Sequence, residues 1–166
     1  RNMFCIGDKV AHPMHGAGII DAIVTETVAG AKQDYYVFRM PVGGLTLKIP
    51  TAAAGTSGLR SIWDLSRVQK LMGDLANLEV ERFTGSWNQR YRENMQKLKS
   101  GDLYEVARVI KGLLHRESER GLSTGERKML RTAKHILISE VALSTGEKYD
   151  DLEHQVDQAV VGGSEE

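Results

Sequence analysis

The chain has 166 residues, of which 41% are apolar and 17 are glycine, and 22 basic and 22 acidic side chains give it a net charge of zero. This composition supports a buried core and excludes an intrinsically disordered protein. No apolar run approaches the roughly 18 residues that span a membrane, and no early stretch has the length of a secretory signal. We therefore expect a cytoplasmic protein of one domain or two small ones.

The first third of the chain predicts short β-strands. Segments 19–28, 34–40 and 45–49 are rich in β-branched and aromatic residues and lie between glycine-rich turns. The last segment alternates, so its residues are expected to face the core and the solvent in turn. The residues expected inside are Leu45, Leu47 and Ile49, and those expected outside are Thr46 and Lys48. Such strands predict a small barrel or a strongly bent sheet.

From about residue 65 the apolar spacing becomes helical and predicts five helices. Three of them begin with the spacing of a capping box, in which two side chains satisfy the first backbone amides of a helix. These pairs are Ser86 with Gln89, Asp102 with Glu105, and Ser123 with Glu126. The predicted fold is therefore α+β with two domains: a small β-module at residues 1–62 and an all-α bundle of about five helices at residues 63–166.

Enzyme and metal signatures are missing from the sequence. It has no phosphate-binding GxxxxGK[ST] loop, no dinucleotide fingerprint and no GxSxG nucleophile motif. His12 and His15 lie near Cys5, but HPMHGAG is more typical of a turn between strands than of a metal site. We expect no catalysis, cofactor, metal or small-molecule substrate, and we expect the single cysteine, Cys5, to be a buried thiol in a reducing compartment rather than a reactive one.

The charge is unevenly distributed along the chain. Residues 1–83 carry 9 basic and 8 acidic side chains, residues 84–140 carry 12 and 7, and residues 141–166 carry 1 and 7. The basic middle includes Arg127, Arg131 and Lys134 at helical spacing. Together with Arg90 and Arg92 these could form one cationic surface for phosphates. The alternative is an ordinary solvated helix face.

Trp87 lies in the first turn of a predicted helix, beside several polar and basic residues. Its alignment with Tyr91 and Met95 favours a tryptophan buried in the core. The alternative is an amphipathic ring at the edge of a basic surface, where it could wedge against or stack on a base.

Several motifs together resemble those of the CarD family, the CarD/CdnL-type bacterial transcription regulators that bind RNA polymerase. They are GDKVAHPMHGAGII, GGLTLKIP, W-N-x-R-Y-R-x-N, SGD, RGLSTGERKML and ILISEVAL. The resemblance runs from about Phe4 to Val160. It implies a Tudor-like (SH3-like) N-terminal domain that docks on the lobe of the polymerase β subunit. It also implies a helical domain that touches promoter DNA at the upstream edge of the melted bubble.

By position, the resemblance places the DNA wedge of the family on Trp87 and DNA-backbone contacts on Arg90, Arg92 and Arg127. Polymerase contacts fall on Lys48 and on its outward-facing neighbour Thr46. The resemblance implies a regulator that stabilises the open promoter complex without hydrolysis or strong sequence reading. We separately expect the protein to be a monomer.

Two residues depart from the pattern of the family. Glu26 stands where some relatives have an arginine facing polymerase, and Gln89 stands where some have an arginine near DNA. Two other hypotheses are a free-standing architectural DNA-binding protein and a pure protein-interaction adaptor whose basic stripe meets an acidic partner.

Overall fold

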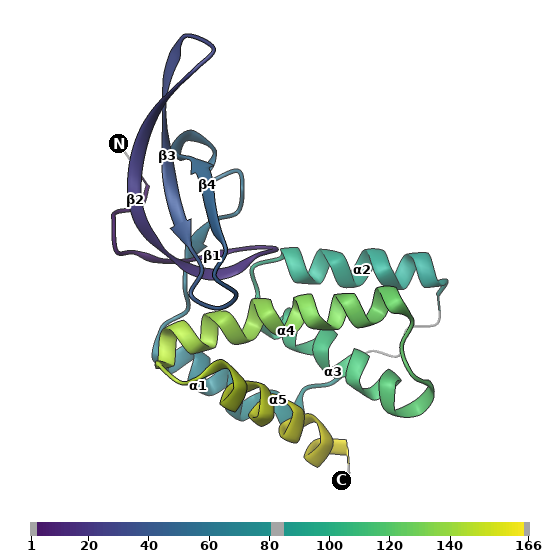
Figure 1. Ribbon diagram of the computed structural model, residues 1–166. Helices are drawn as coiled ribbons and strands as arrows, with labels where there is room; N and C mark the ends of the chain where they lie inside the picture. Colours follow the sequence, from purple (N-terminus) through teal and green to yellow (C-terminus); the bar gives the residue numbers. More distant parts are fainter. Residues whose placement is uncertain (1–2, 81–84, 165–166) are drawn as a thin grey trace.

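The computed structural model describes residues 3–80 and 85–164, in which a β-sheet precedes a bundle of helices (Figure 1). The sheet is antiparallel and five-stranded, with the order β4-β3-β2-β1-β5. Its strands are β1 (Lys9–His12), β2 (Gly16–Val28), β3 (Ala31–Arg39), β4 (Thr46–Pro50) and β5 (Arg60–Ser61), with a short 3₁₀ helix η1 (Thr51–Ala53) between the last two.

Strand β2 gives the sheet its bend. It pairs with β1 near its start and with β3 along most of its 13 residues, and its register shifts between Ile20 and Ala22. A bulge of this kind bends a strand and increases its twist. The sheet thus curls over an apolar cluster whose largest members include Ile20, Tyr36 and Phe38. The predicted small, bent sheet is confirmed.

Two burial predictions in this part of the chain are wrong. Leu45 is 45% exposed, because β4 begins one residue later and the alternation does not extend into the turn before it. Within β4, Leu47 is half-buried and Ile49 is buried, as expected. Cys5 is exposed in the turn before β1, where its backbone amide donates to the Asp8 carboxylate at 2.8 Å. This local turn directs the thiol outward.

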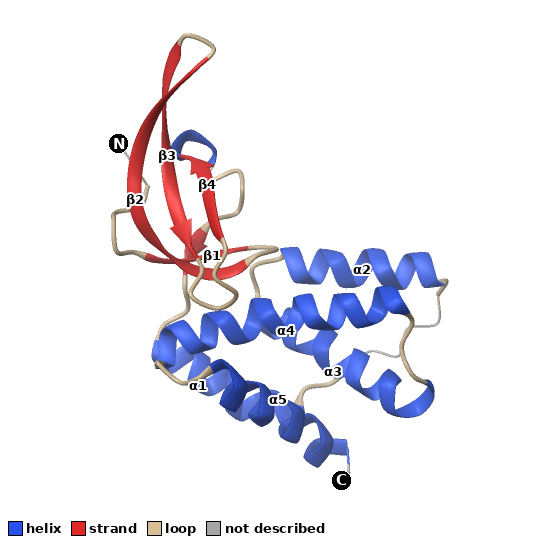
Figure 2. Ribbon diagram, in the orientation of Figure 1, coloured by secondary structure: helices blue, strands red, loops and turns tan. Residues whose placement is uncertain are grey.

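Among the residues that the structure describes, five α-helices follow the sheet, as predicted (Figure 2). They are α1 (Leu65–Asp74), α2 (Trp87–Lys99), α3 (Leu103–Arg120), α4 (Thr124–Thr145) and α5 (Tyr149–Ser164), with a 3₁₀ turn η2 (Leu75–Asn77) after α1. Helix α4 packs against each of the other four and contributes Ala133 and Leu137 to the centre of the helical core. In the described part of the chain, no helix is both long and apolar enough to cross a membrane.

The helix starts follow the capping predictions with one exception. The boxes at 86–89 and 123–126 form with both reciprocal hydrogen bonds. Asp102 caps α3 by accepting the Tyr104 amide at 2.9 Å, but Glu105 does not reach back. It binds Arg108 one turn later at 2.8 Å, so the box predicted at this position is wrong.

Candidate nucleic-acid and partner interfaces

The start of α2 presents two aromatic rings to solvent. Ser86 caps the helix and Trp87 is its first residue, with 44% of its surface exposed. Tyr91 lies one turn later and is 40% exposed, and its ring stacks on that of Trp87 at a centroid distance of 5.3 Å. The prediction that favoured a core tryptophan is wrong. The shared helix face holds an exposed aromatic pair, and only Leu98 of α2 is fully buried.

The indole of Trp87 lies over the first turn of α4. A Cβ placed on Gly125 would come within 3.5 Å of the indole edge, so the ring lies close to the backbone there. The capping box of Ser123 and Glu126 fixes this turn, and the Glu126 carboxylate also pairs with Arg116 of α3 at 2.7 Å. The aromatic pair therefore adjoins a well-fixed helix N-terminus.

Arg127 belongs to the same turn of α4. Its guanidinium donates to the Leu122 carbonyl at 2.7 Å and to the Thr124 hydroxyl at 3.3 Å, and the residue remains exposed. Arg131 is also exposed and follows at i+4, which places it next to Arg127 on one helix face. The structure thus brings Trp87, Tyr91 and Arg127 to one end of the bundle, with Arg131 one turn beyond.

The two arginines of α2 leave the helix on different sides. Arg90 and Arg92 are two positions apart, which corresponds to roughly 200° around a helix of 3.6 residues per turn. Arg90 is half-buried and donates to the Gly85 carbonyl at 3.2 Å, whereas Arg92 is exposed. They therefore flank the aromatic pair and do not extend one flat cationic face.

Lys134 does not belong to the exposed basic surface that its spacing suggested. Only 14% of its side chain is exposed, and its ammonium pairs with Asp157 at 2.9 Å and Glu153 at 3.4 Å, both on α5. Burial alone would lower the pKa of Lys134, but the hydrogen bonds and charges of the two carboxylates outweigh it and raise the pKa. The acidic last helix thus neutralises one end of the predicted stripe.

A second candidate surface lies on the edge strand β4. Thr46 and Lys48 point outward, as predicted, and β4 pairs with β3 on one side only. An edge strand offers unpaired backbone groups to a partner strand. Lys48 forms an ion pair with Glu26, which reaches it from β2 across β3. The departure at position 26 therefore places a carboxylate against the expected polymerase contact.

The histidines near the N-terminus form a turn, as their sequence suggested. The rings of His12 and His15 lie 4.6 Å apart, and the Nδ1 atom of His12 accepts the Met14 amide at 3.2 Å. Among the described residues, no group of three or more histidine, cysteine and carboxylate side chains is arranged to hold a metal ion.

Both parts of the chain match known protein families. Residues 4–62 match the CarD-like/TRCF RID domain, and residues 70–157 match the C-terminal domain of CarD. The chain belongs to the CarD family. It is 39% identical over 144 residues to "Putative transcription factor YdeB" of Bacillus subtilis (strain 168), an alignment that covers 87% of this chain and 94% of that protein.

This membership confirms the resemblance stated from the motifs and identifies the sheet as a Tudor-like RID domain. It indicates a transcription-associated regulator with a domain of the kind that contacts the transcription machinery. In a CarD-family chain the exposed aromatic pair and the β4 edge are candidates for two different partners.

Proposed function

We propose that this CarD-family protein binds the β subunit of bacterial RNA polymerase through its sheet and stabilises the open promoter complex through its helical bundle. In this proposal residues 1–62 form the polymerase-binding domain and residues 63–166 form the DNA-contacting domain. One copy of the chain acts in the cytoplasm, without a cofactor, at the upstream edge of the melted bubble.

The observation that carries the proposal is the exposure of Trp87 and Tyr91 beside Arg127. An apolar ring inserted at a base step can offset part of the cost of unstacking, which amounts to a few kcal/mol. Arginines beside such a ring contact phosphates, and phosphate contacts fix position without reading sequence. The arrangement therefore favours recognition of a junction where the two DNA strands separate, and it does not favour recognition of a particular base sequence.

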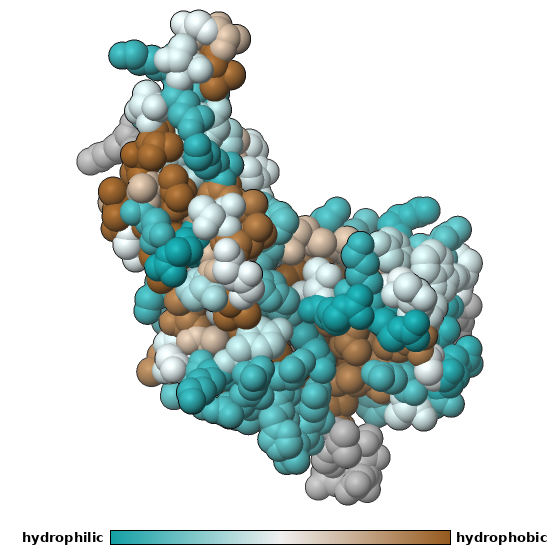
Figure 3. Space-filling model, in the orientation of Figure 1, coloured by the Kyte–Doolittle hydropathy of each residue, from teal (hydrophilic) through white to brown (hydrophobic). Residues whose placement is uncertain are grey.

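The sheet supports the second contact. Its β4 edge displays Thr46 and Lys48, and an exposed edge can accept a strand from a partner by main-chain pairing. On the face in Figure 3, apolar residues gather on the sheet, above the mainly hydrophilic bundle. A protein partner for the sheet and a nucleic-acid partner for the bundle fit this division.

The mechanism is a shift of the promoter equilibrium. A ligand moves a two-state equilibrium only by the difference between its affinities for the two states. The aromatic pair gains contact with DNA only once a base step has opened, so binding favours the open complex. A difference of about 1.4 kcal/mol changes the ratio of open to closed complexes about tenfold.

The test is the lifetime of open complexes formed by purified bacterial RNA polymerase on one defined promoter, measured after addition of a competitor. The full chain should lengthen this lifetime. An unchanged lifetime together with DNA binding would favour an architectural DNA-binding protein. An unchanged lifetime with polymerase binding but no DNA contact would favour an adaptor. Either result would contradict the proposal.

A further inference from the structure

A partly buried ion pair joins the sheet to the bundle. Arg60 of β5 donates two hydrogen bonds, each 2.8 Å long, to the two carboxylate oxygens of Glu140 of α4. Glu140 is only 1% exposed and also accepts the Trp63 amide at 2.9 Å, at the point where the chain enters the bundle. One carboxylate therefore holds the last strand, the connecting segment and the central helix together.

A second polar contact lies one residue earlier on α4. The Ser139 hydroxyl accepts the amide of Ala17 in β2 at 3.0 Å. Gly16, the residue before Ala17, has a φ of +90°. A Cβ on this glycine would lie only 2.4 Å from the hydroxyl oxygen of Ser139. Both the backbone conformation and the close approach require glycine here. The sheet thus approaches α4 at two adjacent helix positions.

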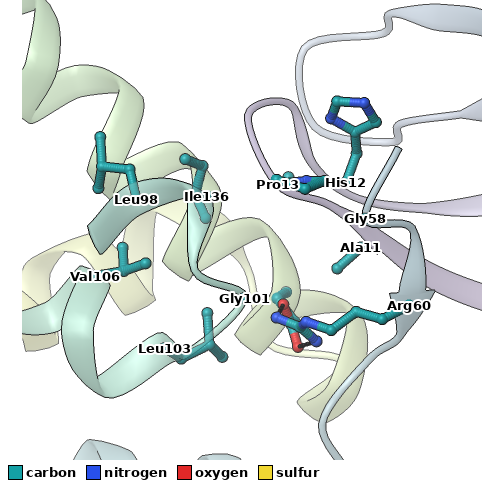
Figure 4. Close-up of a pocket in the computed structure, with 12 residues that line it drawn as sticks. Ala11, His12, Pro13, Gly58, Arg60, Leu98, Gly101, Leu103, Val106 and Ile136 are labelled. Carbon is teal, nitrogen blue, oxygen red and sulfur yellow. Dashed lines mark hydrogen bonds and ion pairs between the residues drawn. The ribbon is translucent and has the colours of Figure 1, made fainter. Parts of the chain in front are cut away.

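Apolar packing alone does not fix how the two parts meet. Their buried apolar residues form two separate clusters, and Met14 of the β1–β2 turn is a partly buried residue that reaches across to the helical one. Figure 4 shows a small pocket between them, lined by Ala11 and Pro13 on one side and by Leu103 and Ile136 on the other. Arg60 extends beside this pocket toward the helices.

We infer that Arg60 and Glu140 are positioning residues that set the angle between the two binding surfaces. An arginine fork on a carboxylate constrains direction as well as distance, which a lysine point charge does not. Apolar contact is non-directional, and the apolar residues at this junction leave a pocket between them. The two hydrogen bonds from Arg60 to Glu140 therefore hold the sheet at one angle to α4. The inference rests on the proposed function, in which one molecule engages polymerase and DNA together.

A fixed angle between the sheet and the bundle would increase the fraction of molecules that bind polymerase and DNA at the same time. Once the sheet is bound, contact of the bundle with DNA is intramolecular, and its strength depends on how often the geometry matches. Preorganisation reduces the ordering cost of the second contact. A chain with a looser junction would keep its affinity for polymerase alone and for DNA alone. Its complex with both partners at once would be less stable.

The junction can be measured directly in the full chain. Cys5 is exposed in the turn that leads into β1, and Glu119→Cys would add a second thiol at the exposed end of α3. Spin labels on these two thiols would report the distance between the sheet domain and the bundle. The variants are Arg60→Lys, which keeps the charge without the fork, and Glu140→Gln, which keeps the shape without the charge. Asp157→Asn is the control, because it disturbs an ion pair inside the bundle.

We expect one narrow distance distribution for the parent chain and the control, and a broader one for Arg60→Lys and Glu140→Gln. Thermal melting of Arg60→Lys should stay close to the parent, since the charge on Glu140 remains compensated. Polymerase binding and DNA binding measured separately should be unchanged, while the gain in open-complex lifetime falls by about threefold or more.

Two results would overturn the inference. An unchanged distance distribution in both variants would mean that the ion pair does not set the angle. A broadened distribution with the full gain in lifetime would mean that the angle does not matter. Failure of the proposed function is distinguishable, because the parent chain itself would then leave the open-complex lifetime unchanged whatever the distances.

Discussion

At the scale of single residues, substitution of Trp87 distinguishes a structural role of this side chain from a functional one. Truncating a buried tryptophan to alanine costs about 3–5 kcal/mol, but Trp87 is 44% exposed. We expect Trp87→Ala to lower the unfolding free energy by about 1 kcal/mol or less and to shorten the open-complex lifetime. Trp87→Phe should keep part of the activity, because an apolar ring remains.

Thermal melting beside the lifetime assay checks this prediction. Trp63→Ala is the matched control, since Trp63 is 6% exposed in the helical core with the Arg67 guanidinium 3.6 Å over its ring. That control should lose most of its stability. A comparable loss of stability in Trp87→Ala would mean that the exposed ring is structural after all.

Substitution of Lys48 likewise distinguishes an effect on stability from an effect on polymerase binding. Lys48→Glu would place two carboxylates together, because Lys48 pairs with Glu26. The side chains of Lys48 and Glu26 are 53% and 41% exposed, so the cost in stability should be about 0.5 kcal/mol or less, whereas polymerase binding should weaken. The double variant Glu26→Lys with Lys48→Glu restores the ion pair in reverse. If pull-down of polymerase recovers in the double variant, the position of the positive charge is unimportant.

At the scale of elements, α2 depends on its cap more than α4 does. Only Leu98 of α2 is fully buried, whereas ten residues of α4 are buried. Loss of a serine N-cap costs about 1 kcal/mol. In α2 we expect Ser86→Ala to loosen the first turn locally, which moves Trp87 and shortens the open-complex lifetime with little change in melting temperature.

Hydrogen exchange of the amides in the first turn of α2 measures that loosening. Ser123→Ala makes the same chemical change at the start of α4, and there it should lower global stability, because the whole bundle packs on that helix. Unchanged exchange in Ser86→Ala would contradict a role for the cap in holding the aromatic pair.

The turn between β1 and β2 should respond to pH. Burial, and secondarily the neighbouring His15, lower the pKa of His12 below 6.5. Its Nδ1 atom accepts the Met14 amide, which an imidazolium cannot do. The unfolded chain therefore binds the proton more readily, and stability should be lost as the pH falls from above 6.5 through the folded pKa.

Melting temperatures at about pH 7.5 and about pH 5.5 test this linkage. His12→Ala should reduce the difference between the two values, whereas His154→Ala, at an exposed position of α5, should leave it unchanged. An equal pH dependence in His12→Ala and the parent chain would assign the effect to another group.

At the scale of the whole molecule, the sequence predicts what depends on neighbours along the chain. Helical spacing identified the five helices and their apolar faces, and serine pairs at short spacing identified two capping boxes. Local spacing along the sequence could not predict contacts between elements that are distant in the chain. Lys134 meets α5 carboxylates 19 and 23 residues later, and Arg60 meets Glu140 80 residues later. Whether Trp87 is buried likewise depends on what packs over α2.

These distant contacts determine how many cations remain for DNA. Lys134 is neutralised by α5, and Arg90 and Arg92 lie on different sides of α2, which leaves about three arginines able to meet phosphates at once. For duplex DNA, each phosphate contact contributes about −0.9 to the slope of log affinity against log salt. The full chain should therefore bind duplex or forked DNA weakly, with little sequence preference and a slope of roughly −3.

Fluorescence anisotropy across a salt series measures this slope in matched variants. Arg131→Ala should weaken binding to all sequences alike and flatten the slope by about one contact, since Arg131 is exposed. Lys134→Met removes an equal charge one turn away, but that charge already pairs with Asp157, so the slope should not change. A slope near zero would remove DNA as a partner. Equal slopes in Arg131→Ala and the parent would place the phosphates away from this face of α4.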